Sequence, residues 1–518
     1  MAIYLPPAIP PQQADVQMMQ QAAAAGSTYT VGSYQARVSG NTLLTAEQMQ
    51  EAIGSATNPS EAVLQLAAAY GREGHMMVTL FYALDGQTLY IQVNEGYLDK
   101  LVAPEALVPF FEGFVGQKNL TRTQLDRKLV LADIKATRAG QDVAVTYQVN
   151  GSDPQKVTMI FTATPREDHD PLKISLEVGN PGNRFLGRYF AQLAARYQTR
   201  EGAEYVTAWQ TALTSIGNPR GGKDYNQYQF NLNHPTPLGL YGFDISHTGY
   251  TQEVMGFDFD GEIIDVGLTG QQLVWSDEVS RITLNERLEH IESEIEDTST
   301  GVKVQDEPHS SAEIGVNYTR DMHTDTRRAR LGAGIAVKTG VSNDEGTLDQ
   351  DGPEVIGGRR TAEYVALKPN ATYAMSIFTD SILSFDALGQ ITEDQVPEQQ
   401  QWVLGGMGSM SAYLPGVLEG DTGYYARAKL EFASRPVWRV QIVPTLFVEA
   451  GGARFEQVSG DDADLRSIVD AGFRLAIRLG EHLTIEGVAA KSLSDRNLDD
   501  AFLDDFEVDG FISIKGTF

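Results

Sequence analysis

The sequence predicts a membrane-spanning antiparallel β-barrel of about 16 strands, preceded by two small α/β modules. The chain ends on a strand, Gly510–Phe518, in which apolar and polar residues alternate and the last residue is aromatic. After residue 172, alternating segments follow one another without an intervening helix. Their connections alternate between short turns and long, acidic, glycine-rich loops, as they do in outer-membrane barrels.

The composition narrows the class of protein. The chain of 518 residues is too long for one ordinary domain, and its lack of cysteine excludes disulfides and cysteine-ligated metals. No run of 18 apolar residues is present, which excludes a transmembrane helix but not strands of alternating polarity. A net charge of −29 argues against nucleic acid as a partner, because phosphates require a basic surface.

Residues 1–27 are predicted to be a leader, followed by a first module over residues 28–97. Within the leader, residues 14–25 are a candidate short helix that would plug a pore, although a flexible leader is the preferred interpretation. The module has the order β-α-α-β-β, starting with a strand over residues 29–38. Thr45–Gln48 is a capping box that begins a helix, and Asp85-Gly86 is the turn of a hairpin.

A second module over residues 98–167 repeats this order. Residues 102–108 are apolar enough for its first strand. Thr121–Gln124 is another capping box, and residues 143–149 and 156–162 are two alternating strands. Two modules of about 70 residues with one order predict an internal repeat.

Residues 168–518 are predicted to form the barrel. Its last strand places Ile512, Ile514 and Phe518 toward lipid, where they close the barrel and act as its assembly signal. A soluble β-sandwich would show the same alternation, but the number of strands and the terminal strand favour the barrel. Counting the strands makes residues 404–421 the sixth outer loop.

Several motifs resemble the Omp85 superfamily. The order of the modules, with the segments Tyr70–Gly74 and Val93–Gly96, resembles polypeptide-transport-associated (POTRA) domains. The sixth loop resembles that of two-partner secretion transporters, the haemolysin secretion/activation family, and Val178–Gly182 resembles the signature of their first strand. The matching residues of the loop are Gly405, Gly406, Ser409, Ser411, Ala412, Tyr413, Gly420 and Asp421.

The resemblance implies that loop 404–421 folds into the lumen. In the family an arginine of the loop pairs with an aspartate of the wall, but Ser411 and Ala412 stand here in place of its Arg-Gly. Glu449 stands at the position of the aspartate, within Phe447–Gly451. A carboxylate in a narrow lumen needs another cation. Three basic residues are predicted on the lumen faces of neighbouring strands: Arg427, Lys429 and Arg439.

The resemblance also implies a function: a translocation pore in the outer membrane of a Gram-negative bacterium that secretes a partner exoprotein. Its periplasmic POTRA domains would capture the unfolded client by strand addition. Outer-membrane lipid, lipopolysaccharide and the barrel assembly machinery are further expected partners, and no cofactor is expected. Two alternatives stay open: an assembly factor that opens the seam between the first and last strands, and a passive porin.

Some segments look like chemical sites and are predicted not to be. Residues 217–224 nearly spell a phosphate-binding loop, but Asp224 replaces its Ser/Thr and no helix follows. The acidic segments 349–352 and 499–505 lack the spacing of a calcium-binding EF-hand. Neither His-Glu-x-x-His nor Gly-x-Ser-x-Gly occurs, so the sequence indicates no enzyme.

Overall fold

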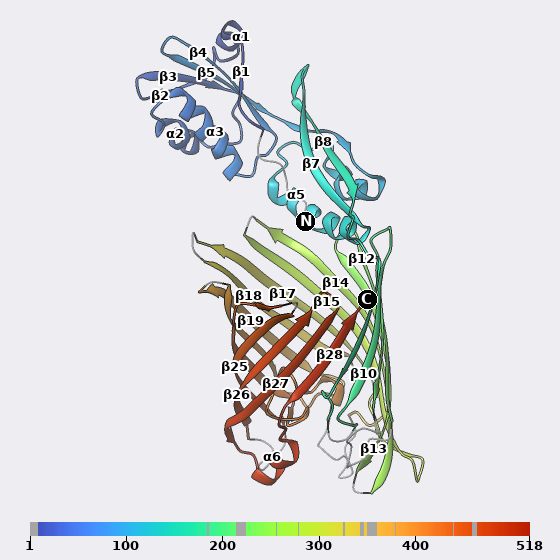
Figure 1. Cartoon of the computed structure of the whole chain (residues 1–518). Coiled ribbons are helices and arrows are strands. Elements are labelled where there is room, and N and C mark those ends of the chain that lie inside the picture. Colours follow the sequence, from blue (N-terminus) through green and yellow to red (C-terminus); the bar gives the residue numbers. More distant parts are fainter. Residues whose placement is uncertain are drawn as a thin grey trace.

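The structure is a computed structural model in which two N-terminal modules stand at one end of a closed β-barrel (Figure 1). It describes residues 9–183, 186–213, 224–254, 256–277, 279–324, 327–341, 346–349, 360–378, 380–438, 440–457 and 464–518. Among these residues no helix is long and apolar enough to cross a membrane. Most of the segment that resembles a phosphate-binding loop, residues 217–223, lies outside the described residues, as do residues 350–352.

The first module packs two helices, α2 (Ala46–Gly54) and α3 (Pro59–Arg72), on a sheet of order β1-β4-β5-β3-β2. Its strands are β1 (Gln12–Gln13), β2 (Ser27–Val31), β3 (Tyr34–Ser39), β4 (Val78–Asp85) and β5 (Thr88–Glu95). The capping box at Thr45 is present. The single strand expected over residues 29–38 is wrong, because Gly32 adopts a φ of 55° and turns the chain into the hairpin β2–β3.

The N-terminal segment belongs to the first module. Helix α1 (Val16–Ala22) is capped by Asp15 and buries Met19, which is 1% exposed. It contacts β4 and β5, and β1 pairs in parallel with β4. The flexible leader preferred from the sequence is therefore wrong for residues 9–25, and the helix lies on the module and not in the pore.

The second module has a sheet of order β6-β8-β7, formed by β6 (Tyr97–Val102), β7 (Gln141–Asn150) and β8 (Asp153–Pro165). Its long helix α5 (Arg122–Arg138) begins with the expected capping box at Thr121. The strand expected over residues 102–108 is wrong: β6 ends at Val102 and short helices follow, η1 (Glu105–Leu107), α4 (Val108–Phe111) and η2 (Glu112–Phe114). Their apolar side chains, such as Leu107 and Phe111, fill the core of the module.

Sixteen long antiparallel strands close the barrel within the described part of the chain, and β16 (Val302–Asp306) and β24 (Arg435–Val437) extend two of its hairpins. The sixteen strands are β9 (Leu172–Gly179), β10 (Phe190–Gln198), β11 (Glu204–Ala212), β12 (Asp224–Pro235), β13 (Leu240–Val254), β14 (Phe257–Ser276), β15 (Ser280–Asp297), β17 (His309–His323), β18 (Arg328–Val341), β19 (Val365–Ile377), β20 (Ser381–Thr392), β23 (Thr422–Glu431), β25 (Val440–Arg454), β26 (Arg466–Leu479), β27 (Leu483–Arg496) and β28 (Phe511–Thr517).

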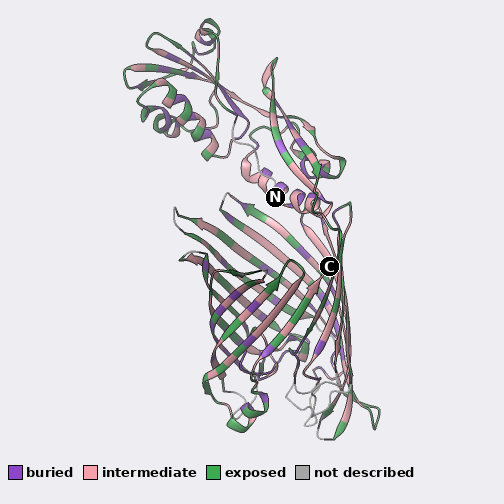
Figure 2. Cartoon of the chain, viewed as in Figure 1, coloured by how far each residue is buried: buried purple, intermediate pink, exposed green. Residues whose placement is uncertain are grey.

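The two faces of the barrel differ in polarity. Leu268, Leu288 and Ile314 each expose more than half of their surface on the outer face. On the inner face, buried Glu289 pairs with Lys338. The strands therefore show exposed and half-buried residues in alternation, whereas buried residues concentrate in the modules (Figure 2). This is the pattern of a barrel with an apolar outside and a polar lumen.

The barrel closes where β28 pairs with β9. The amide and carbonyl groups of Phe518 bond those of Ile174 at 2.8 and 2.9 Å. At the other end of this seam, the side chain of Asn180 accepts from the amide of Ile512 at 2.6 Å and donates to Gly510 O at 3.2 Å. Ile512, Ile514 and Phe518 are 48%, 44% and 71% exposed. Asn180, in the segment that resembles the first-strand signature, thus holds the two ends of the barrel together.

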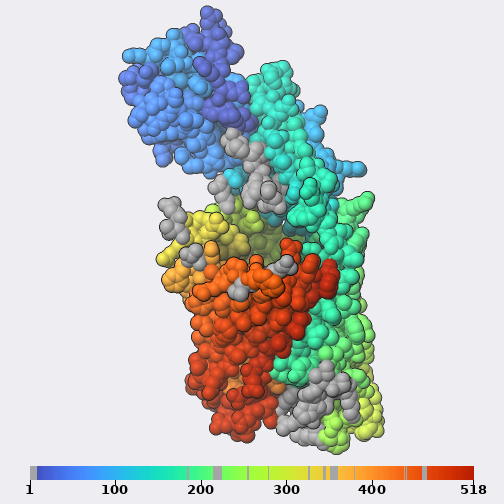
Figure 3. Space-filling view, in the orientation of Figure 1, coloured from blue at the N-terminus to red at the C-terminus, as the bar shows by residue number. Residues whose placement is uncertain are grey.

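Helix α5 joins the second module to the barrel. Arg127 Nε donates to Leu273 O at 2.9 Å, Lys128 Nζ bonds Pro237 O, and Arg138 Nη1 donates to Asn233 O at 3.3 Å. Arg138 also pairs with Glu204 at 3.2 Å. The space-filling view shows the second module seated on the β10–β14 part of the rim (Figure 3). Basic side chains of one helix therefore fix the module to the ends of neighbouring strands.

Candidate functional site

The candidate site is the loop between β20 and β23, which occupies the lumen. Its stem is a short hairpin of β21 (Trp402–Leu404) and β22 (Leu418–Gly420). Gly405 and Gly406 follow the stem with φ values of 121° and 93°, and a Cβ on Gly405 would lie 2.1 Å from Leu414 O. Ser409 Oγ bonds both backbone groups of Gly405 at 3.2 and 3.3 Å. The glycines therefore allow a tight turn that no other residue could form.

The tip of the loop is bound to two carboxylates of the barrel wall. The amide and the hydroxyl of Ser411 donate to Glu449 Oε2 at 2.9 and 2.8 Å. The amide of Ala412 donates to Asp470 Oδ2 at 3.0 Å. Glu449 and Asp470 are opposite each other on β25 and β26, and both are at most 1% exposed. Three donors of the loop thus bond one oxygen of each of the two buried carboxylates.

The wall supplies the cation for Glu449. Arg427 Nη1 lies 3.6 Å from Glu449 Oε1 and donates to Gly408 O at 2.9 Å. The hydroxyl of Tyr425 lies 2.6 Å from the same carboxylate oxygen. Lys429 pairs instead with Asp386 at 3.1 Å, so the structure does not bring it to Glu449. Arg439 lies outside the described residues.

Asp470 is a site residue that the sequence analysis missed. Asp470 precedes Arg474 by four residues and Arg478 by eight on β26. Side chains of a strand alternate between its faces, so all three residues share the lumen face. This alternation of charged residues along the strand is the sequence signal that identifies Asp470 as a lumen residue. Two adjacent carboxylates repel each other, and the amides of the loop offset this repulsion while the loop is in place.

The last outer loop covers the other side of the tip. Helix α6 (Asp500–Phe506) packs Leu503 and Phe506 on the loop, in one apolar cluster with Met410 and Tyr413. Leu414 N donates to Phe506 O at 2.8 Å, and Val508 N donates to Ala412 O at 3.1 Å. The acidic residues of this segment hide the helix in the sequence, although Phe502, Leu503 and Phe506 follow the N-cap Asp499 at helical spacing.

Gly420 and Asp421 organise the base of the loop. Asp421 is 1% exposed and accepts from the amides of Val396 at 3.0 Å and Glu456 at 2.9 Å. Burial raises its pKa in spite of these two bonds. A Cβ on Gly420 would lie 2.4 Å from Arg454 O. These two residues therefore connect three outer segments and do not touch the carboxylates of the wall.

Among the described residues, no group of three or more potential ligands is arranged to hold a metal ion.

Comparisons with known proteins identify relatives of the chain. The family described as haemolysin secretion/activation protein ShlB/FhaC/HecB matches residues 164–474. CdiB from Escherichia coli has a TM-score of 0.74 at 15% identity, over 97% of this chain and 96% of that one. CdiB from Acinetobacter baumannii has a TM-score of 0.66 at 11% identity, over 95% and 90% of the two chains. No curated protein matches in sequence.

A BamA structure from Haemophilus ducreyi that lacks POTRA domains 1–3 is also similar, with a TM-score of 0.51 at 13% identity over 95% of this chain and 100% of that one. At these identities the structures show the fold alone, a 16-strand barrel preceded by POTRA domains. The family match covers more than half of the chain, from the end of the second module through most of β26. The barrel therefore lies in the outer membrane of a Gram-negative bacterium, with the POTRA domains in the periplasm. The chain belongs to the haemolysin secretion/activation protein ShlB/FhaC/HecB family, the outer-membrane transporters that export an exoprotein in two-partner secretion.

Proposed function

We propose that the exoprotein crosses the outer membrane through the barrel lumen, and that loop 404–421 leaves the wall to let it pass. The bonds of Ser411 and Ala412 to Glu449 and Asp470 carry this proposal, because they hold the loop inside the lumen. A passive porin would keep a water-filled channel open. The bonds of the loop join neutral groups to carboxylates, and water can replace such bonds when a client arrives.

The POTRA domains capture the unfolded client at the edges of their sheets. Strand β2 is an edge of the first sheet, and β6 and β7 are the edges of the second. An edge strand presents unpaired amide and carbonyl groups to an extended segment of another chain. Folding of the client outside the cell then prevents its return, and the transporter itself catalyses no reaction.

Lipid and the barrel assembly machinery complete the set of proposed partners. The apolar outer face contacts outer-membrane lipid and lipopolysaccharide. Ile512, Ile514 and Phe518, on the terminal strand, form the signal that the assembly machinery reads. The hydrogen-bonded seam, with Asn180 across its end, favours a transporter over an assembly factor that works by opening β9 from β28.

A comparison of secreted proteins tests the function. A strain that lacks this chain is compared with the same strain carrying it, by mass spectrometry of the medium and of the cell surface. We expect one or two large exoproteins to disappear while other outer-membrane barrels stay. Loss of several barrels would identify an assembly factor. If neither the exoproteins nor the other barrels changed, export would be contradicted and a passive porin would be the remaining alternative.

A further inference from the structure

The segment that leads into the loop contacts a different wall of the barrel. Helix η3 (Glu398–Gln400) lies between β20 and β21, and its partners come from β15, β17 and their connection. In the barrel, β17 is separated from β25 by β18, β19, β20 and β23. The loop segment is thus attached at two places, one near its start and one at its tip.

The side chain of Gln400 makes the first of these contacts. Its Nε2 donates to Glu289 Oε1 at 2.8 Å and lies 3.2 Å from His309 Nε2. The backbone carbonyl of Gln400 accepts from Gln390 Nε2 at 2.8 Å. Gln400 is 7% exposed and His309 is fully buried. These polar groups are therefore closed off from water although they lie inside a polar lumen.

Glu307 makes the second contact. One of its carboxylate oxygens accepts from the amide of Glu398 at 2.8 Å, and the other accepts from Arg360 Nη1 at 2.7 Å. Arg360 also pairs with the side chain of Glu398 at 3.3 Å. Both end residues of η3 are therefore held: Glu398 by Glu307 and Arg360, and Gln400 by Glu289.

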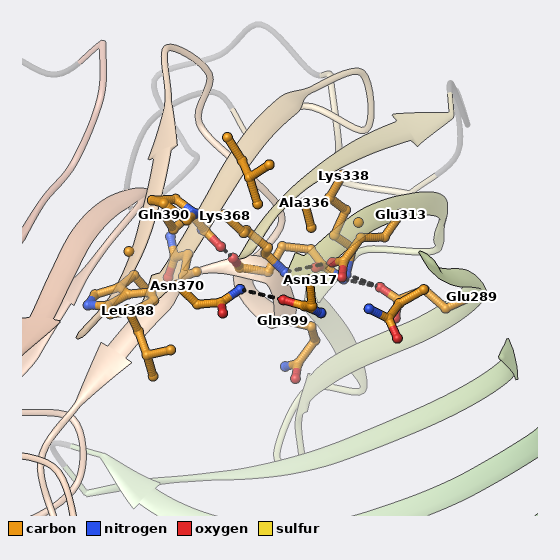
Figure 4. A pocket seen from close by; sticks show the side chains of 18 of the residues that line it. Glu289, Glu313, Asn317, Ala336, Lys338, Lys368, Asn370, Leu388, Gln390 and Gln399 are labelled. Carbon is orange, nitrogen blue, oxygen red and sulfur yellow. Dashed lines mark hydrogen bonds and ion pairs between the residues drawn. The ribbon is translucent and has the colours of Figure 1, made fainter. Parts of the chain in front are cut away.

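η3 forms the outward end of a cavity in the lumen. The cavity has a volume of about 640 Å³, and its wall carries the pairs Glu313–Lys368 at 3.2 Å and Asn317–Asn370 at 3.3 Å (Figure 4). Residues 399–402 line its other side. On β15, which runs outward, the cavity is lined by Asn285, Glu289 and Ile291, so η3 binds to Glu289 in the outer half of the cavity.

We propose that η3 is a second gate of the pore, which acts in series with the tip of the loop. This inference rests on the proposed export through the lumen. Breaking the bonds of Ser411 and Ala412 frees the tip but leaves η3 over the cavity. The path opens fully only when Gln400 and Glu398 also leave Glu289 and Glu307.

The test compares the conductance of the full-length protein and its variants in planar lipid bilayers, which requires no client. Gln400→Glu places a carboxylate against Glu289, and we expect large openings to become roughly tenfold more frequent through this repulsion. Gln399→Glu is the matched control: it makes the same change of charge in the neighbouring residue, whose side chain lies away from Glu289 (Figure 4). Equal conductance of the two variants would overturn the proposal.

The series arrangement is tested by combining Gln400→Glu with Glu449→Gln at the tip. If both contacts must break, their free energies add. The fold-increase in opening frequency of the double variant is then the product of the two single fold-increases. Two independent leaks would give the sum of the increases, and that result would reject a series gate. The change in electrophoretic mobility on heating verifies that each barrel is folded.

A reversible cross-link tests the gate during export. The chain contains no cysteine, so Gln400→Cys with His309→Cys provides one defined pair for a short, cleavable thiol cross-linker. We expect cross-linking to stop release of the exoprotein and a reductant to restore it. Undiminished export by the cross-linked protein would overturn the gate but leave export established. Conductance changes in a chain that exports no exoprotein would support the gate and contradict the proposed function.

Discussion

The tip of the loop brings no charged side chain to Glu449, which lowers the expected cost of opening the proposed gate. The cation that faces Glu449 is Arg427, a residue of the wall, so it stays beside the carboxylate when the loop departs. The loop itself brings uncharged groups to this site: two amides, a hydroxyl and the carbonyl of Gly408. Hydrogen bonds to charged groups contribute about 1.5–3 kcal/mol each, and no buried ion pair has to be separated.

Glu449→Gln is expected to weaken closure. A neutral amide accepts hydrogen bonds less strongly than a carboxylate, and Arg427 keeps Asp386 as a charged partner but loses Glu449. Openings in planar bilayers should therefore become roughly tenfold more frequent. Glu486→Gln is the control, because Glu486 pairs with Arg474 in the same cavity and does not bond the loop. Equal effects of both variants would show that lumen charge, and not the loop contact, determines conductance.

His75 makes the stability of the first POTRA domain depend on pH. Burial lowers its pKa from 6.5, although Glu95 and Glu73 act in the opposite direction. The unfolded chain therefore binds a proton before the folded chain does, and the domain loses stability as the pH falls below about 6.5.

Hydrogen exchange of the full-length protein in detergent measures this loss. After correction for intrinsic exchange rates, protection of residues 59–95 should decrease between pH 7.5 and lower pH in the wild type. The decrease should be smaller in His75→Gln, which has no titrating ring. An unchanged decrease in that variant would assign the effect to other groups.

At the scale of elements, the sequence predicts the features that depend on bonds between residues close to each other in the chain. Both capping boxes, at Thr45 and Thr121, begin helices as expected, because the bonds that define them lie within four residues. The strand expected over residues 102–108 is wrong because a short apolar run suits a buried helix equally well. The bonds of Gln400 to Glu289 and of Ala412 to Asp470 could not be predicted, since their partners lie 111 and 58 positions apart in the chain.

Helix α5 is expected to be required for productive docking of the second POTRA domain. Arg138→Glu places a carboxylate against Glu204 and removes the bond to Asn233 O, so the joint should loosen and export should fall several-fold. Proteolysis of residues 166–171 in intact membranes should be faster. Lys118→Glu, at an exposed position of the same domain, serves as the control and should change neither readout.

At the scale of the whole molecule, the seam between β9 and β28 offers a test of whether the protein works as a transporter or as an assembly factor. Ser175 and Thr517 face each other across β9 and β28, in the pair next to the one that Ile174 and Phe518 form by mutual hydrogen bonds. Such a pair is not hydrogen-bonded, so its side chains are close enough for a disulfide.

The double substitution Ser175→Cys with Thr517→Cys is expected to leave export intact after oxidation, because the proposed path of the client is the lumen. Export is compared before and after reduction of one preparation, so each sample is its own control. If oxidation stopped export and reduction restored it, the seam would have to open during function.

The attachment of the second POTRA domain on one side of the rim has a mechanical consequence. Arg127, Lys128 and Arg138 hold α5 against the ends of β12 to β14, away from the barrel axis. In the proposed export, a client that folds outside would pull its trailing segment along the axis while that segment still binds the domain. The pull is off-centre, so it acts as a torque about α5. The tension of export is then borne by a few bonds between basic side chains and backbone carbonyls, and these bonds set the load at which the domain tilts.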